Sequence, residues 1–256
     1  MSKRQKFVLV SVVLSIFMFI VAVSDFYDQN ILVLILGLIS FFLCFWSLRE
    51  SLLTKAAYLS LILPVSFTLG VGFFYFLLPE QWLIRLPIIT LYGVGVYALL
   101  LTANIYTVAS IRTIALARAA QAVGYVLTLF TLFLLYDTIL SFRLYPWSNA
   151  ILVVLVSLPL YLQGIWSSEV SETVPRKYIY YSIILSLVVG EITLGLSLWP
   201  VTVTVGSLFL TTMGYILLGI SQHELTGRLF RQTIWEYLAV GGAVFITMFL
   251  TTRWGG

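Results

Sequence analysis

One acidic residue lies deep inside a long apolar segment, where a carboxyl group is uncommon. Glu191 falls just past the middle of the apolar run Tyr178–Leu198. Acids within a bilayer are rare and tend to serve transport or proton relay. The next apolar run carries Thr204, Ser207 and Thr211, and their spacing places three hydroxyl groups on one helical face. If Glu191 faces this strip, it finds hydrogen-bond donors there.

Two roles fit such a carboxyl group. Gly195, one turn after Glu191, leaves that helix face locally thin, so that a neighbouring helix or water can approach. An unpaired carboxylate in hydrocarbon is costly, so the neutral acid is the expected form. The acid then either binds a proton or cation during transport or ties two helices together. The structural role is favoured, and Glu191, Thr204, Ser207 and Thr211 remain the candidates for a substrate or ion path.

A second group of polar residues falls near those ends of the apolar segments that face outside in the orientation argued below. These residues are Asp25, Asp28, Arg85, Asp137 and Arg143. Acids and arginines gathered at the outer face can hold a lipid-linked phosphate or a metal ion. Ordinary ion pairing at helix ends explains the same residues and is favoured over a site.

The residues with metal-binding or nucleophilic chemistry are too few to form a known site. His223 and Cys44 are the only histidine and the only cysteine. A zinc site usually needs three or four ligands. The motifs of zinc proteases, serine hydrolases and P-loop ATPases are absent. We therefore expect no metal and no cofactor, assign no catalytic residue, and hold an enzyme to be the less favoured interpretation.

The elements that must position these residues are apolar helices. Hydrophobic residues make up 61% of the 256-residue chain and charged residues 9%, whereas soluble domains carry about a quarter charged residues. A helix needs about 20 mostly apolar residues to cross the bilayer. We predict an all-α bundle, a single transmembrane domain over residues 1–256 without a soluble domain. Its nine predicted spans are Phe7–Val23, Ile31–Ser47, Ala57–Leu78, Leu86–Val108, Ala119–Phe142, Asn149–Trp166, Tyr178–Leu198, Val201–Ile220 and Thr233–Thr252.

The boundary between the seventh and eighth spans is the weakest. The run from Tyr178 to Ile220 is too long for one crossing and too short for three. Trp199 and Pro200 lie near its middle, and proline disfavours helix at the residue before it. We therefore predict a tight hairpin at these two residues.

The basic residues predict the orientation, because Lys and Arg stay preferentially on the cytoplasmic side. With the N-terminus inside and the C-terminus outside, only Arg85, Arg143 and Arg253 of the 14 basic residues fall outside. The others lie at cytoplasmic ends, where they meet anionic headgroups: Lys3, Arg4, Lys6, Arg49, Lys55, Arg112, Arg118, Arg176, Lys177, Arg228 and Arg231. This spread also excludes a nucleic-acid groove, although the net charge is +4.

The first span has two interpretations. Lys3, Arg4 and Lys6 precede its apolar run, and the small residues Ala22 and Ser24 follow, as in a cleavable signal peptide. The apolar run is longer than the usual signal core, which favours a retained anchor. Cleavage would leave eight spans with the mature N-terminus outside.

A polar stretch between the fourth and fifth spans carries a family resemblance. It runs from Leu101-Thr102-Ala103-Asn104-Ile105-Tyr106 to Ile111-Arg112-Thr113-Ile114-Ala115-Leu116-Ala117-Arg118-Ala119-Ala120. The stretch resembles a segment of an uncharacterised multi-pass bacterial membrane protein family. The resemblance implies no activity and transfers no functional residue.

These observations favour an integral protein of a prokaryotic-type plasma membrane. Its expected partners are membrane lipids and possible further membrane subunits. The favoured function is a transporter of a small solute, ion or lipid, or a membrane subunit of one. A scaffold subunit of a membrane complex is one alternative. The other is an embedded enzyme or lipid-binding protein that acts on a lipid-linked substrate at the outer face.

Overall fold

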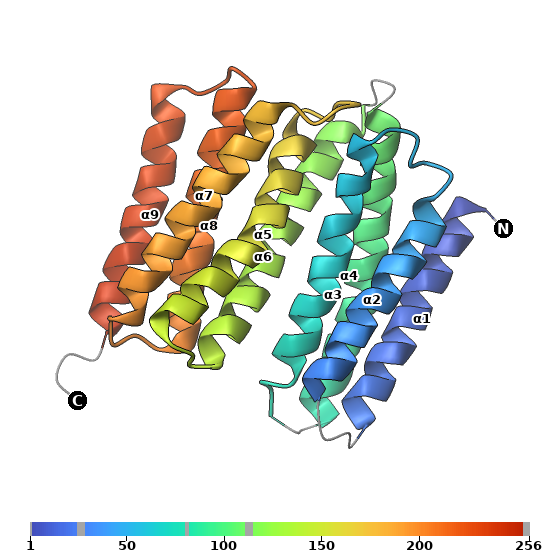
Figure 1. The fold of residues 1–256 in the computed structure, drawn as a ribbon, viewed down its shortest axis with the longest axis horizontal. Helices are drawn as coiled ribbons and strands as arrows, with labels where there is room; N and C mark the ends of the chain where they lie inside the picture. Colours follow the sequence, from blue (N-terminus) through green and yellow to red (C-terminus); the bar gives the residue numbers. More distant parts are fainter. Residues whose placement is uncertain (1, 25–28, 80–81, 111–114, 253–256) are drawn as a thin grey trace. The chain divides into compact units, whose positions relative to one another are not determined.

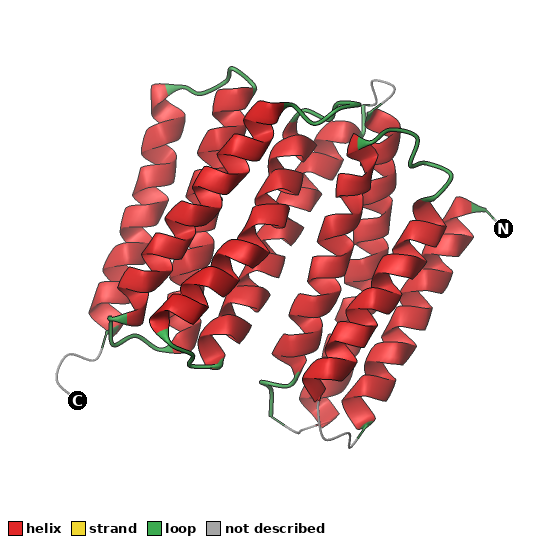
Figure 2. Cartoon of the chain, viewed as in Figure 1, coloured by secondary structure: helices red, strands yellow, loops and turns green. Residues whose placement is uncertain are grey.

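The computed structural model describes residues 2–24, 29–79, 82–110 and 115–252. These ranges contain helices and connections and no strand (Figure 2). In chain order the helices are α1 (Lys3–Val23), α2 (Gln29–Leu48), the 3-10 helix η1 (Ala56–Leu61), α3 (Ile62–Tyr75), α4 (Trp82–Ala109), α5 (Ala117–Ser141), α6 (Pro146–Ser168), α7 (Arg176–Ser197), α8 (Val203–Leu225) and α9 (Arg231–Thr251) (Figure 1).

Nine helical segments in the described ranges are long and apolar enough to cross a membrane, with η1 and α3 counted as one. The prediction of nine spans and of an all-α architecture is therefore confirmed. Helices suit this environment because they satisfy their backbone hydrogen bonds internally, without water. The chain is an integral membrane protein.

The third span differs from the prediction because it is not one continuous α-helix. Its first six residues form η1, and the α-helix starts only at Ile62. Pro64 explains the break, since a proline lacks the N–H for an α-helical bond and its ring clashes with the carbonyl four residues earlier, that of Ser60. The tighter 3-10 turn avoids this conflict.

The chain divides into two compact units, which are described separately. Unit 1 comprises Met1–Leu127 and Val170–Val174, and unit 2 comprises Thr128–Glu169 and Pro175–Gly256. A backbone hydrogen bond joins the short segment Val170–Val174 to the rest of unit 1: Ala56 N donates to Glu172 O over 3.3 Å.

Unit 1 is built around α1 to α4. Helix α1 packs on α2 and α4, and α3 packs on the same two helices. Within this core the hydroxyl of Tyr92 donates to Thr68 Oγ1 over 3.1 Å, and Thr68 lies 3.0 Å from Ser40 Oγ. A Cβ on Gly72 would lie 2.7 Å from Val33 Cγ1, so the close approach of α2 and α3 depends on this glycine. Three helices are thus joined by buried hydroxyl groups and close contact.

Unit 2 contains the last four helices, each packed on the next, with a further contact between α6 and α8. Residues 142–145 connect α5 to α6, and residues 198–202 connect α7 to α8. Both connections lie at one end of unit 2, together with the last turn of α9 (Figure 1). We call this the hairpin end. It is here that polar side chains and a pocket occur together.

Candidate functional site

The connection between α7 and α8 forms the tight hairpin that the sequence predicts. Val201 N donates to Trp199 O over 2.8 Å, which closes the turn around Pro200. The Trp199 indole N–H donates to Thr252 Oγ1 over 3.0 Å, and its ring contacts that of Phe249 edge-on. The turn is therefore fastened to the end of α9.

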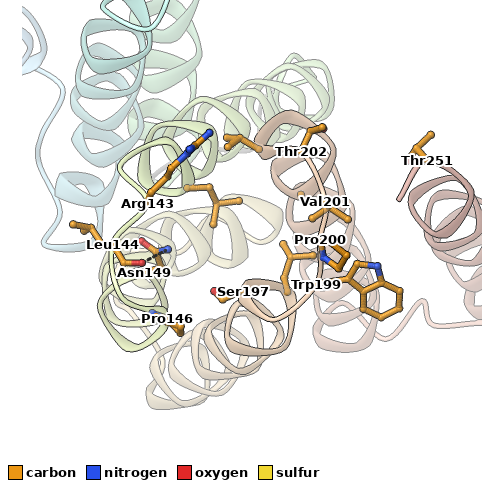
Figure 3. A pocket seen from close by; sticks show the side chains of 14 residues that line it. Arg143, Leu144, Pro146, Asn149, Ser197, Trp199, Pro200, Val201, Thr202 and Thr251 are labelled. Carbon is orange, nitrogen blue, oxygen red and sulfur yellow. Dashed lines mark hydrogen bonds between the residues drawn. The ribbon is translucent and has the colours of Figure 1, made fainter. Parts of the chain in front are cut away.

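A pocket of about 670 Å³ opens at the hairpin end, between the two connections (Figure 3). Its wall is mostly apolar, formed by residues such as Leu140, Leu196 and Val203. Polar side chains come from five places along the chain, and no acidic residue lines it. The polar lining residues are Arg143, Asn149, Ser197, Thr202 and Thr251.

Asn149 in the first turn of α6 is the buried polar side chain of this pocket, with 6% of its surface exposed. Its Nδ2 donates to the carbonyl of Leu144 over 3.4 Å. That carbonyl needs a donor, so it fixes which way the amide faces. The Oδ1 atom is buried without a hydrogen-bond partner. Such an acceptor is costly unless something donates to it.

Arg143 supplies the positive charge. It lies exposed in the connection between α5 and α6 and has φ of 49°, the one positive φ at a non-glycine residue in the described ranges. Its backbone N–H donates to Leu140 O over 3.2 Å. No ion pair or hydrogen bond engages its guanidinium in the part of the chain that the structure describes. The charge is therefore available at the pocket.

Helix α8 begins at the same pocket. Thr202 is its N-cap residue, but its side chain makes no capping hydrogen bond. The first N–H groups of a helix lack partners within the helix, and they carry a partial positive charge. The start of α8 therefore adds donors to the charge of Arg143.

Asp137 and Ser207 form a buried pair beside the pocket. Ser207 Oγ donates to Asp137 Oδ1 over 2.8 Å, across 70 positions of sequence. Asp137 is 6% exposed and Ser207 fully buried, and within the described ranges Asp137 is the one buried acid. Leu140, one turn after Asp137, and Gly206, just before Ser207, both line the pocket. The pair therefore lies directly behind the pocket wall.

Further buried polar groups continue away from the pocket inside unit 2. The hydroxyl of Tyr136 lies 2.7 Å from Ser157 Oγ and 3.3 Å from the hydroxyl of Tyr161. Nearer the other end, Gln222 Nε2 donates to the carbonyl of Gly164 over 2.8 Å. From Ser207 to Gln222 the polar groups cover about 22 Å of α8, at 1.5 Å per residue. They thus extend over most of a bilayer's hydrocarbon thickness.

A family model described as "Protein of unknown function (DUF5656)" matches residues 10–251. The chain belongs to the DUF5656 family. No curated protein and no solved structure matches it. Membership of DUF5656 agrees with the expectation of an uncharacterised family, and it assigns no activity to the pocket.

In this DUF5656 chain the three hydroxyl residues of the predicted strip differ in their burial. Ser207 is buried against Asp137, whereas Thr204 is exposed and Thr211 is half-buried. The hydroxyl of Thr211 donates back to Ser207 O over 2.7 Å. Of the strip, Ser207 alone reaches an acid in the described part of the chain, and this acid belongs to the other predicted group.

Glu191 is not brought to the hydroxyl strip. Its side chain is exposed on α7 and lines a small apolar groove of about 290 Å³, together with Trp147 and Leu187. None of its neighbours in the described structure forms a hydrogen bond or an ion pair with it. The expected tie between α7 and α8 through Glu191 is therefore not seen.

The predicted outer cluster is brought together only in part. Asp137 and Arg143 belong to the hairpin end of unit 2. Arg85 belongs to unit 1, where its guanidinium lies 5.2 Å from the ring centre of Tyr75. Asp25 and Asp28 lie outside the described residues.

The described ranges contain no group of three or more His, Cys, Asp or Glu side chains that could hold a metal ion. His223 instead lies near Tyr237, with ring centres 6.1 Å apart. Cys44 is buried in unit 1, 3.9 Å from Ser40 Oγ. The polar atoms of the pocket itself suit an organic or phosphate-bearing ligand better than a metal ion.

Asn149 and the tyrosine group were not singled out from the sequence. A signal was present, because Asn149, Ser157 and Gly164 recur at helical spacing on one face of α6. Small and polar residues on one face of a membrane helix mark the side that packs on protein. That face is buried, as the exposure of these three residues shows.

Proposed function

We propose that the protein is a transporter, or the membrane subunit of one, in which Asp137 binds a proton or a cation. The observation that carries the proposal is the buried Asp137–Ser207 pair beside the pocket. Ionisable groups within membrane helices line ion pathways and proton relays. Asp137 has a neutral hydrogen-bond partner and no ion-pair partner in the described ranges, so a change of its charge is not blocked by a fixed cation.

The surroundings of Asp137 support a path. The pocket opens on one side of the pair, and the tyrosine, serine and glutamine groups continue on the other. A scaffold subunit needs buried polar groups only to join helices, and it needs no pocket beside them. This combination favours transport over scaffolding.

The orientation of the path follows from the basic residues. We place the N-terminus inside and the hairpin end outside, in a plasma membrane of prokaryotic type. In this orientation the pocket faces the outer side, and Asp137 lies between the pocket and the centre of unit 2. A solute that enters from outside meets the pocket first.

A flux measurement tests the proposal without knowledge of the cargo. The protein is reconstituted in vesicles that contain a pH-sensitive dye, and gradients of Na⁺ or K⁺ are imposed. We expect a pH change that Asp137→Asn abolishes and that Glu191→Gln, the matched removal of a carboxyl group at an exposed position, leaves intact.

Infrared difference spectra between acidic and basic pH provide a second measurement on the same proteins. The protonated-carboxyl band should contain one component that the wild type and Glu191→Gln share and that Asp137→Asn lacks. If Asp137→Asn changes neither the flux nor this band, the proposal fails and the scaffold alternative replaces it.

A further inference from the structure

The pocket at the hairpin end presents two kinds of polar group whose partners are missing in the described structure. Arg143 has an unpaired guanidinium, and Asn149, also a lining residue, has the acceptor Oδ1 buried without a partner. One is a cation and the other a neutral acceptor. A ligand that satisfies both must carry an anionic group and a hydrogen-bond donor.

The anionic part of that ligand fits the Arg143 side of the pocket. A guanidinium binds phosphate through two parallel hydrogen bonds. The uncapped start of α8, at Thr202 and Val203, lines the same pocket and favours phosphate as well. No lining residue is acidic.

The donor part is selected by Asn149. A buried carbonyl oxygen accepts from a hydroxyl or an ammonium group and gains nothing from a bare anion. The oxygen is buried in the pocket wall and has lost its contact with water, so a ligand that leaves it without a donor binds less favourably. The ligand therefore carries a hydroxyl or ammonium group a short distance from its phosphate.

The size and walls of the pocket fit a group larger than free phosphate. Its volume of about 670 Å³ suits a small organic ligand. Leu140, Leu196 and Pro200 offer apolar surface to carbon atoms. The pocket lies at the ends of membrane-crossing helices, which is the level of lipid headgroups.

We propose that this pocket binds a phosphate ester that carries a neighbouring hydroxyl or ammonium group. A phospholipid headgroup such as phosphoglycerol has this chemistry, and so does a free solute such as glycerol 3-phosphate. The inference goes beyond the proposed function, because binding in the pocket does not require Asp137 to change its charge.

The binding test uses the full chain in nanodiscs and in detergent. Native mass spectrometry measures retained phosphatidylglycerol against phosphatidylcholine, and calorimetry measures glycerol 3-phosphate and inorganic phosphate. In Arg143→Asn the charge is removed while a residue that tolerates positive φ is kept. We expect binding of the phosphate ester to fall at least about tenfold, because the charged hydrogen bonds from the guanidinium are lost.

Matched variants separate the two halves of the site. Asn149→Leu should lower affinity for the hydroxyl-bearing ester more than affinity for inorganic sulfate, a tetrahedral anion without a hydrogen-bond donor. Arg228→Gln removes a charge at the opposite end of unit 2 and should change neither. Asp137→Asn should keep binding while it loses the pH-coupled flux, so that failure of one proposal is distinguished from failure of the other.

The outcomes assign the source of the ligand. Retention of phosphatidylglycerol alone identifies a lipid headgroup, and binding of glycerol 3-phosphate alone identifies a free solute. Either result supports the site. Equal binding by wild type and Arg143→Asn, with both proteins folded by circular dichroism and thermal unfolding, overturns it. An equal loss in Arg228→Gln overturns it as well, because the effect would then be general electrostatics.

Discussion

At the scale of single residues, burial decides which acidic residue is the better candidate for function. Asp137 and Glu191 both lie within membrane-crossing helices, but Asp137 is buried against Ser207 and Glu191 is exposed beside an apolar groove. A buried carboxyl group without a donor is costly. The serine hydroxyl removes part of that cost, so the two residues should behave as one unit.

We expect Ser207→Ala to destabilise the protein by about 1–3 kcal/mol, because Asp137 then loses its hydrogen-bond donor. The measurement is the free energy of unfolding in mixed detergent. In the double variant Ser207→Ala with Asp137→Ala, the loss should be smaller than the sum of the single losses, because each removes the same bond. Additive losses would show that the two side chains do not interact.

Glu191→Leu, in contrast, should change the unfolding free energy by less than about 0.5 kcal/mol, as for an exposed side chain without partners. The reason is that no described neighbour bonds to the carboxyl group. The same unfolding assay applies, with Ser207→Ala as the sensitive reference. A loss as large as that of Ser207→Ala would indicate that another chain covers Glu191.

At the scale of helices, the sequence predicts the spans well and their polar ends less well. Apolar length is enough to find nine crossing segments, and the proline rule locates the hairpin at Trp199. Helix α8 continues to Leu225, beyond the predicted end at Ile220. The polar residues of its last turns remain helical because Gln222 bonds to the carbonyl of Gly164, a contact that hydropathy does not contain.

Close packing of α2 on α3 depends on a missing side chain. Gly72→Ala should destabilise by about 1–3 kcal/mol, because the new Cβ meets the stiff, branched Val33. Gly242→Ala is the matched control in α9, where no atom lies within 4 Å of the added carbon. It should stabilise by about 0.5–1 kcal/mol through helix propensity, as measured by unfolding of both variants. Equal effects at the two glycines would contradict the packing.

An ion pair joins the start of α1 to the segment after α2. The Lys6 ammonium bonds to Glu50 and lowers the pKa of this exposed carboxyl group. A lowered pKa means that the stabilisation is present above the ordinary carboxyl range and is lost as the pH falls through the folded-state pKa. Carboxyl NMR titration should show the Glu50 pKa rise in Lys6→Gln and stay unchanged in Lys55→Gln. An unchanged pKa in Lys6→Gln would exclude the pair.

At the scale of the whole molecule, the site could not be assembled from the sequence. Asp137 and Ser207 are 70 positions apart in the sequence and lie on different helices. A local sequence pattern does not predict a contact between residues so far apart. In a membrane both the inner and the outer faces of a helix are apolar, so hydropathy does not tell which face is buried. This is why the sequence predicts Ser207 and Glu191 as functional candidates but does not predict whether their side chains lie close together.

The distribution of the 14 basic residues predicts the orientation of the chain, that is, which side of the membrane each connection faces. In a Cys44→Ala background, single cysteines at Asn30 in unit 1 and Ser148 in unit 2 should react with a membrane-impermeant maleimide added outside intact cells. Cysteines at Leu53 and Arg228 lie at the opposite ends of their units and should be protected until the cells are permeabilised. All four positions are at least partly exposed, so burial in the protein does not cause protection. A permeant maleimide is the control for reactivity.

Labelling of Arg228 from outside, with protection of Ser148, would place the hairpin end and its pocket on the inner side. The phosphate ester would then be drawn from the cytoplasm or the inner leaflet.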